Sequence, residues 1–241
     1  MTPAPLDEFL TQMAALLDGR KTAQQVEQVL GKSASGTQRL GLYATLVERQ
    51  QRGAIDGFYQ AAQVASDTRA AGQFAKLRDA FLRKHPAASW SPARACEQLG
   101  PFLAGRSVPI EVRELVDFGW TRHWVLHAPQ RDDASGLAVR HYTHGVRDFS
   151  HQVERERLRK GRPRPGDETW LMGRARSTAE LVILQPSVAA LVAVQVLTDG
   201  AWSDGLPAVS GKQVVEEAEH LRSVGLLAPS AVTQVAGWVP R

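Results

Sequence analysis

Apolar residues recur at helical spacing through the first half of the chain. The first stripe predicts an amphipathic helix over residues 5–18, with neighbours three or four positions apart: Leu6, Phe9, Leu10, Met13, Leu16 and Leu17. Comparable stripes predict helices over residues 23–30, from Thr37 to a break at Gly53, and over residues 74–85, 92–105 and 109–127. We therefore expect a helical bundle in this half of the chain.

The pattern changes to a period close to two after residue 136. Residues 137–147 alternate in this way, which predicts a strand that continues toward Phe149. Residues 169–174 and 180–184 predict a second and a third strand, and the latter contains a short, β-branched apolar run. Helices then follow over residues 186–199 and 212–222. Three strands followed by helices indicate an α+β domain at the C-terminal end.

A basic run separates the first two predicted strands. Its glycines and prolines predict an exposed loop rather than packed structure. The run contains Arg155, Arg157, Arg159, Lys160, Arg162 and Arg164.

We expect a helical N-terminal domain, residues 1–130, and an α+β domain, residues 131–241. The 241 residues are 43% hydrophobic and 22% charged, which is ordinary for a globular protein. The N-terminus lacks the basic-then-apolar pattern of a secretion signal, and no apolar run is long enough to span a bilayer. Together with a single cysteine, Cys96, these features predict a cytoplasmic protein that does not bind a membrane.

Candidate catalytic and metal-binding residues are sparse. His123 and His127 are four residues apart, a spacing at which two imidazoles on one helix can bind the same metal ion. The residues between them are Trp-Val-Leu, so the glutamate of a zinc-protease motif is missing, and ordinary helix packing is the simpler interpretation. The chain also contains no glycine-rich phosphate loop and no GxSxG turn. We expect no resident metal, no cofactor and no catalytic activity of its own.

Two segments of the C-terminal half carry a resemblance to a known element. VILQPSVAALVAVQVLTDG, residues 182–200, and VVEEAEHLRSVGLL, residues 214–227, are similar to the peptide-recognition element of ribosomal-peptide maturation systems. The resemblance implies a winged-helix-like fold in which a leader peptide lies between the third strand and the last helix.

The N-terminal half has a resemblance of its own. RLGLYATLVERQQRGAIDGFYQAA, residues 39–62, and FAKLRDAFLRKHPAASWSPARACEQLGPFLAG, residues 74–105, resemble a family described as a DNA-binding domain. Its members are often encoded beside multinuclear iron-dependent oxidative enzymes. Both halves together resemble the partner subunits of such enzymes in methanobactin and thiaglutamate biosynthesis. This resemblance implies a non-catalytic subunit that binds the leader of a precursor peptide and presents it to the iron-dependent enzyme.

The resemblance also implies which residues contact the peptide, and residue types indicate which contact the enzyme. The peptide groove would be lined by Glu180, Leu181, Val182, Ile183, Leu184, Lys212, Val215, Ala218 and Arg222. Tryptophan and arginine are enriched at interface centres. The expected contacts with the enzyme are therefore Arg39, Arg49 and Arg52, together with Trp120 and Trp124, which the helical pattern places on an inner face.

The alternative function is that of a DNA-binding winged-helix regulator. A net charge of +4 permits such a partner, and the basic run between the first two strands would supply contacts to phosphates. The last predicted helix, however, carries Glu216, Glu217 and Glu219, where a recognition helix needs a basic or neutral face. Nucleic acid is therefore the less favoured partner.

Overall fold

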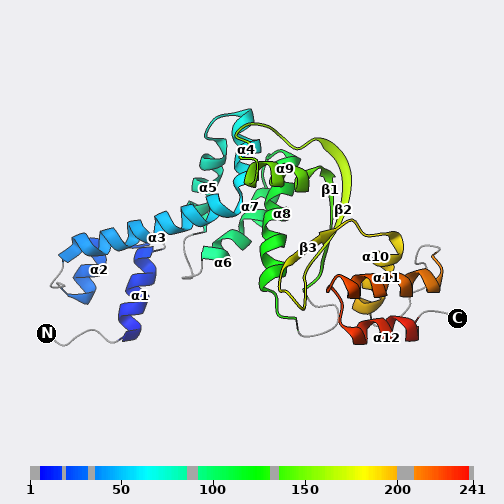
Figure 1. The fold of residues 1–241 in the computed structure, drawn as a ribbon. Coiled ribbons are helices and arrows are strands. Elements are labelled where there is room, and N and C mark those ends of the chain that lie inside the picture. The colour runs from blue at the N-terminus through cyan, green and yellow to red at the C-terminus, as the bar shows by residue number, and fades with distance from the viewer. Residues whose placement is uncertain are drawn as a thin grey trace. The chain divides into compact units, whose positions relative to one another are not determined.

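The computed structural model describes residues 6–17, 20–31, 36–85, 92–130, 136–199 and 209–238 (Figure 1). Within these ranges, helices and a three-stranded antiparallel sheet make up the chain, so the expected α+β class is confirmed. None of the described helices is both long and apolar enough to cross a membrane.

The chain divides into two compact units. One comprises Met1–Asp117 with Arg147–Pro163, and the other comprises Phe118–Val146 with Arg164–Arg241. The expected boundary at residue 130 lies inside the second unit. The segment after the first strand returns to the first unit instead of staying with the sheet.

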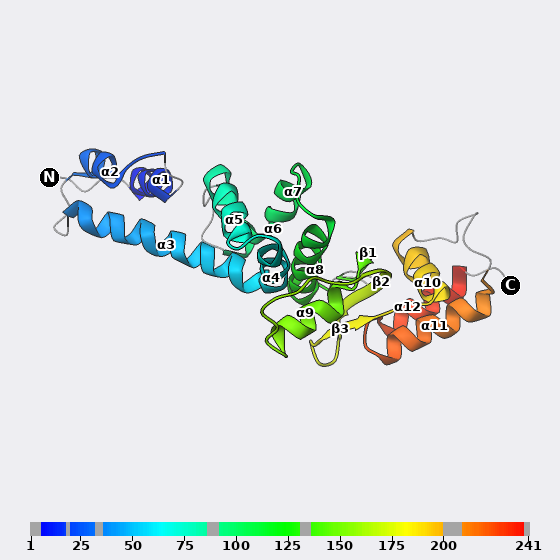
Figure 2. The same ribbon diagram turned by 90° about the horizontal axis from the view of Figure 1, so that it is seen from above.

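The first unit is helical. Helices α1 and α2 lie beside the N-terminal part of α3, where Met13, Leu16 and Val26 form a small apolar core with Leu40 and Tyr43 (Figures 1 and 2). The described helices of this unit are α1 (Leu6–Leu17), α2 (Ala23–Leu30), α3 (Gly36–Phe58), α4 (Gln60–Arg69), α5 (Gln73–Lys84), α6 (Pro92–Glu97), α7 (Leu99–Ala104), the first part of α8 (Ile110–His127) and nearly all of α9 (Val146–Glu154).

Helix α3 continues through Gly53, so the predicted break at this position is wrong. A glycine inside a helix costs roughly 1 kcal/mol relative to alanine. Gln51 and Ile55, two residues on either side, are both buried, and their packing keeps the helix intact. The helix ends at Phe58 instead, and α4 begins after Tyr59.

Helix α9 is the main departure from the sequence-based prediction. The strand predicted over residues 137–147 was expected to continue toward Phe149, but it ends at His144, and α9 begins at Val146. Val146, Phe149 and Val153 are all buried. Their spacing of three and four residues is that of one helical face, which explains why a helix replaces the extended continuation.

The second unit contains the sheet and the C-terminal helices. Its strands are antiparallel neighbours in the order β1–β2–β3. Strand β2 begins earlier than the sequence predicted, and the last helix was not predicted. The elements are β1 (Ala138–His144), β2 (Pro165–Arg174), β3 (Leu181–Leu184), α10 (Val188–Asp199), α11 (Gly211–Ser223) and α12 (Pro229–Trp238).

Helices α10 to α12 share an apolar core with one face of the sheet. Leu171 of β2 is fully buried in this core. Gly173, two residues further along β2, faces the same side, and a Cβ atom there would lie 2.6 Å from a Leu137 methyl and 2.7 Å from a Leu226 methyl. The other face meets the end of α8, where the Arg174 guanidinium donates to the Leu126 carbonyl at 3.0 Å. The β2–β3 part of the sheet is therefore covered on both faces.

Candidate functional site

Strand β3 forms one edge of the sheet. It pairs with β2 from Leu181 opposite Arg174 to Leu184 opposite Leu171. On its other side, no backbone segment among the described residues is hydrogen-bonded to it. An edge of this kind presents unpaired N–H and C=O groups to which another strand can be added.

The hydrogen-bond pattern identifies the groups that face the open edge. The Ala175 N–H donates to the Glu180 carbonyl at 2.8 Å, so these residues belong to a hydrogen-bonded pair of the antiparallel ladder. Such pairs alternate with pairs that exchange no hydrogen bond. In the observed register, Leu181 and Ile183 belong to pairs that exchange no hydrogen bond. The N–H and C=O groups of Leu181 and Ile183 therefore point away from β2, toward the open edge.

The side chains of β3 divide between the two faces of the sheet. Val182 and Leu184 pack against the core that α10 to α12 form. Leu181 and Ile183 lie on the opposite face, because successive residues of a strand alternate in direction. All four side chains are half-buried. A peptide added at this edge would meet apolar side chains on both faces.

A backbone hydrogen bond joins the turn before β3 to Gly225, two residues after the end of α11. The Arg176 N–H donates to the Gly225 carbonyl at 2.9 Å. Gly225 has a φ of 81°, and a Cβ atom there would lie 3.3 Å from the Ala175 Cβ, so glycine suits both the backbone conformation and the close approach. This contact fixes the start of β3 before any ligand binds, and a preformed edge loses less entropy on binding.

Helix α11 supplies less of the predicted groove than the resemblance implies. Ala218 is fully buried in the core, and Val215 is partly buried against the same core. Glu180, immediately before β3, is exposed. We therefore leave Ala218 out of the candidate site, which lies along β3.

The two basic residues of the predicted groove are exposed and paired within their own helix. Lys212 lies 3.6 Å from Glu216, and Arg222 lies 2.7 Å from Glu219. Exposed ion pairs of this kind contribute roughly 0–1 kcal/mol each. Any contact that these residues make with a peptide would replace a weak existing pair and add little net free energy.

The arginines expected to contact a partner protein differ in their surroundings. Arg39 and Arg49 are exposed on α3. Arg52 instead lies 2.7 Å from Glu48 and 3.7 Å from Asp79, so it helps to join α3 to α5. Arg49 is therefore the better candidate for a surface contact than Arg52.

Sequence reasoning missed two apolar residues on the same helix. Leu42 and Leu46 have 58% and 60% of their surface exposed, although large apolar residues gain free energy when they are buried. They are four positions apart and therefore lie on one face of α3. The signal was present in the sequence, since both residues fall outside the apolar stripe formed by Leu40, Tyr43 and Val47.

One tryptophan and the two histidines of α8, Trp120, His123 and His127, form an aromatic cluster. Trp124 is 41% exposed, so its predicted inward position is wrong, whereas Trp120 is half-buried. The His123 ring lies 5.4 Å from the Trp120 ring and 4.1 Å from the His127 ring. Burial, with a smaller contribution from His127, lowers the pKa of His123. Across the described part of the chain, no group of three His, Cys, Asp or Glu residues is arranged to hold a metal ion.

Cys96 is a buried thiol of the first unit. It has no exposed surface, and burial raises the pKa of its thiol to about 12. Its backbone carbonyl accepts a hydrogen bond of 2.8 Å from the Tyr59 hydroxyl. At neutral pH the thiol is protonated, and the thiolate is the nucleophilic form of cysteine. Cys96 therefore packs as a small apolar side chain.

Comparison with known proteins gives no family assignment. No protein-family model matches the chain, and no curated protein matches it. The open edge of β3 and the exposed surfaces are therefore the structural features from which a function can be inferred.

Proposed function

We propose that this chain binds an extended peptide by adding it as a fourth strand beside β3. The observation that carries the proposal is the open edge of β3, at which Leu181 and Ile183 each direct a backbone N–H and a C=O away from β2. A peptide that pairs with these groups by β-augmentation makes main-chain hydrogen bonds, each contributing roughly 0.5–1.5 kcal/mol net.

The side chains beside this edge determine which peptide sequences it prefers. Main-chain pairing accepts almost any sequence, whereas the half-buried Leu181 and Ile183 on one face and Val182 and Leu184 on the other provide apolar contacts. Alternate residues of the added strand would contact opposite faces. The preferred ligand is therefore an extended peptide with apolar side chains on alternate positions.

We further propose that the peptide is the leader of a ribosomally made precursor and that the chain presents it to a multinuclear iron-dependent oxidative enzyme. This part of the proposal comes from the resemblance of both halves of the sequence to partner subunits of such enzymes. The exposed face of α3 that carries Leu42, Leu46 and Arg49 is the surface we assign to the enzyme. Binding both molecules would raise the local concentration of substrate at the oxidative centre.

The acidic surface of α11 argues against the DNA-binding alternative. Glu216, Glu217 and Glu219 lie along this helix, and two of them already pair with its basic residues. Phosphates would be repelled by such a surface, since nucleic-acid binding depends strongly on basic contacts. We therefore retain peptide binding as the proposed function.

A proline substitution tests the open edge directly. Ile183→Pro removes an N–H that β2 does not use, and it places the pyrrolidine ring where the added strand would lie. The matched control is Ile183→Ala, which loses the same side chain and keeps the N–H. We expect affinity for the labelled leader, measured by fluorescence anisotropy, to fall about tenfold from the alanine to the proline variant.

A second variant separates edge binding from a general defect. Val182→Pro removes a donor from the β2–β3 ladder, so it should lower the melting temperature, whereas Ile183→Pro should stay close to Ile183→Ala. Equal leader affinity for Ile183→Pro and Ile183→Ala, with both variants folded, would refute binding at the edge.

A further inference from the structure

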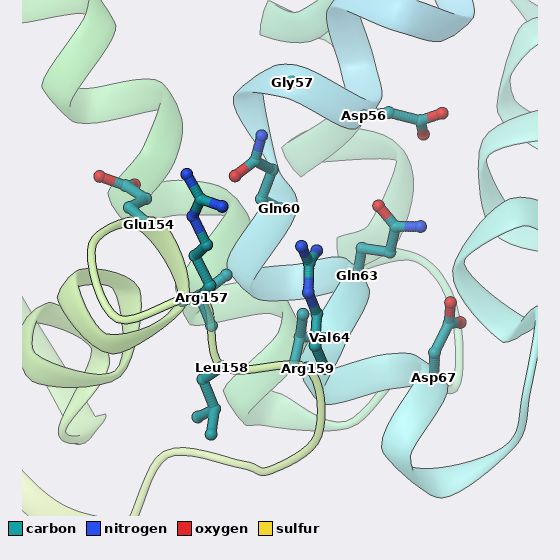
Figure 3. A pocket seen from close by; sticks show the side chains of 11 residues that line it. Asp56, Gly57, Gln60, Gln63, Val64, Asp67, Glu154, Arg157, Leu158 and Arg159 are labelled. Carbon is teal, nitrogen blue, oxygen red and sulfur yellow. The ribbon is translucent and has the colours of Figure 1, made fainter.

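A polar pocket lies within the first unit, on the surface where the end of α3 and the helix α4 face the loop that follows α9 (Figure 3). Its volume is about 550 Å³, which is in the range of small-ligand sites. Gln60 and Gln63 line it from α4, and Arg157 and Arg159 line it from the loop. Figure 3 shows that both arginine side chains extend toward α4, while Leu158 between them extends the opposite way.

Backbone and side-chain contacts fix the loop that carries the two arginines. The Leu158 N–H donates to the Gln152 carbonyl at 3.1 Å, which closes the end of α9. The Gly161 N–H donates to the Thr68 hydroxyl of α4 at 2.8 Å. Arg157 lies within the turn that the first contact closes, and Arg159 lies between the two contacts. The backbone of both residues is therefore placed beside α4 by the fold.

Arg157 adopts a backbone conformation that favours glycine. Its φ is 58°, in the left-handed region, at a position just after a helix where glycine is the common residue. An arginine here therefore has a less favourable backbone conformation than glycine would have. Glycine would suit this backbone conformation but would place no guanidinium in the pocket.

The acidic and basic residues of the pocket differ in what already binds them. The Asp56 carboxylate accepts a hydrogen bond from the Arg78 guanidinium, and the Asp67 carboxylate accepts one from the Phe74 N–H at 2.9 Å. The side chains of Arg157 and Arg159 make no hydrogen bond or ion pair with any residue that the structure describes. The pocket therefore has cationic donors available, while two of its carboxylates are engaged.

We propose that this pocket binds the carboxylate of an aspartate or glutamate side chain in an acidic peptide segment. Guanidinium groups bind carboxylates through paired, charge-assisted hydrogen bonds. The amides of Gln60 and Gln63 both donate and accept, so they can bind the adjoining peptide groups. The proposal uses no residue of β3 and is independent of peptide binding at that edge.

The charges around the pocket favour a carboxylate over a phosphate. Asp56, Asp67 and Glu154 line the pocket together with the two arginines, so the formal charge of its ionisable residues is −1 (two positive, three negative). A dianionic phosphate group would be repelled by these carboxylates more strongly than a singly charged carboxylate. Of these two anions, the carboxylate of an acidic side chain is therefore the one that the pocket accepts more readily.

The test uses the full chain and a dye-labelled hexapeptide of alternating glutamate and glycine. Affinity is measured by fluorescence anisotropy for the unmodified protein and for Arg157→Gly and Arg159→Gln. The control is Arg155→Gln, because Arg155 is exposed in the same loop but does not line the pocket. We expect each pocket variant to bind about tenfold more weakly, and the control to stay within about twofold of the unmodified protein.

Arg157→Gly also separates a binding defect from a folding defect. Glycine accepts the left-handed conformation, so this variant should melt at the same temperature as the unmodified protein or higher. An equal loss of affinity in Arg155→Gln would overturn the proposal, because it would indicate diffuse attraction to the basic run. Absence of peptide binding to the unmodified protein at millimolar concentration would also overturn it, as would stronger competition by inorganic phosphate than by unlabelled peptide.

Discussion

The buried pair formed by Tyr59 and Cys96 predicts that the first unit loses stability in mild alkali. Burial raises the pKa of the Cys96 thiol from 9.0 to about 12. Burial, with smaller contributions from Cys96 and Asp117, also raises the pKa of Tyr59 above its ordinary value of 10.0. Below pH 9 both groups are protonated in the folded and the unfolded chain. Above it, the unfolded chain releases protons that the folded chain retains, so stability falls as pH rises.

The magnitude follows from the number of protons released. Between the unfolded and folded pKa values, each group lowers the free energy of unfolding by about 1.4 kcal/mol per pH unit. From pH 8 to pH 10, Cys96 should account for about 1.4 kcal/mol and Tyr59 for about 0.4 kcal/mol. Cys96→Ala should lose about 1 kcal/mol at neutral pH from the small cavity, and should then show a shallower alkaline decline.

The assay is urea denaturation, followed by far-ultraviolet circular dichroism at pH 8 and pH 10, for the unmodified protein and Cys96→Ala. A thiol reagent provides a second readout, because Cys96 should react only when urea unfolds the chain. If both proteins lost the same stability between the two pH values, or if the folded protein reacted rapidly at pH 8, the burial argument would be refuted.

Two further predictions concern the exposed face of α3 and the metal content of the chain. Leu42→Asp combined with Leu46→Asp should abolish co-purification with the proposed iron-dependent enzyme. It should change the free energy of unfolding by no more than about 0.5 kcal/mol, because both side chains are exposed. Arg49→Glu should weaken the same contact, and retained co-purification in all these variants would exclude this face of α3. The purified chain should contain only substoichiometric iron and zinc by elemental analysis, and His123→Ala with His127→Ala should leave those values unchanged; a full equivalent lost in that variant would contradict the prediction.

The sequence predicted the elements whose periodicity is set by one dominant core. Strand β3 and helix α11 begin and end within one residue of their predicted bounds, because Val182, Leu184, Val214 and Leu221 all belong to the same apolar core. The α+β class follows from the same pattern. The finer winged-helix arrangement comes from the resemblance and stays a prediction.

The wrong predictions occur where the helical and the strand period compete, or where tertiary packing outweighs the local preference of a residue. The residues after His144 are compatible with the period of a strand and with that of a helix. Only the burial of Val146, Phe149 and Val153 selects the helix α9. At Gly53 the packing of α3 outweighs the local glycine penalty.

The pocket of the first unit was beyond sequence reasoning for a different reason. Gln60 and Arg157 are far apart in the chain, and only the fold brings the loop after α9 beside α4. In the sequence, Arg157 and Arg159 belong to a basic run whose composition predicts exposure but not the direction of any side chain. The left-handed backbone of Arg157 likewise has no sequence signal.

Amide hydrogen exchange in the third strand tests peptide binding at the edge most directly. In the free chain, the N–H groups of Val182 and Leu184 should exchange slowly because they face β2, whereas those of Leu181 and Ile183 should exchange rapidly. A saturating amount of the precursor leader should slow exchange at Leu181 and Ile183 and leave Val182 and Leu184 nearly unchanged. Unaltered exchange at Leu181 and Ile183 in the bound state would contradict the proposed function.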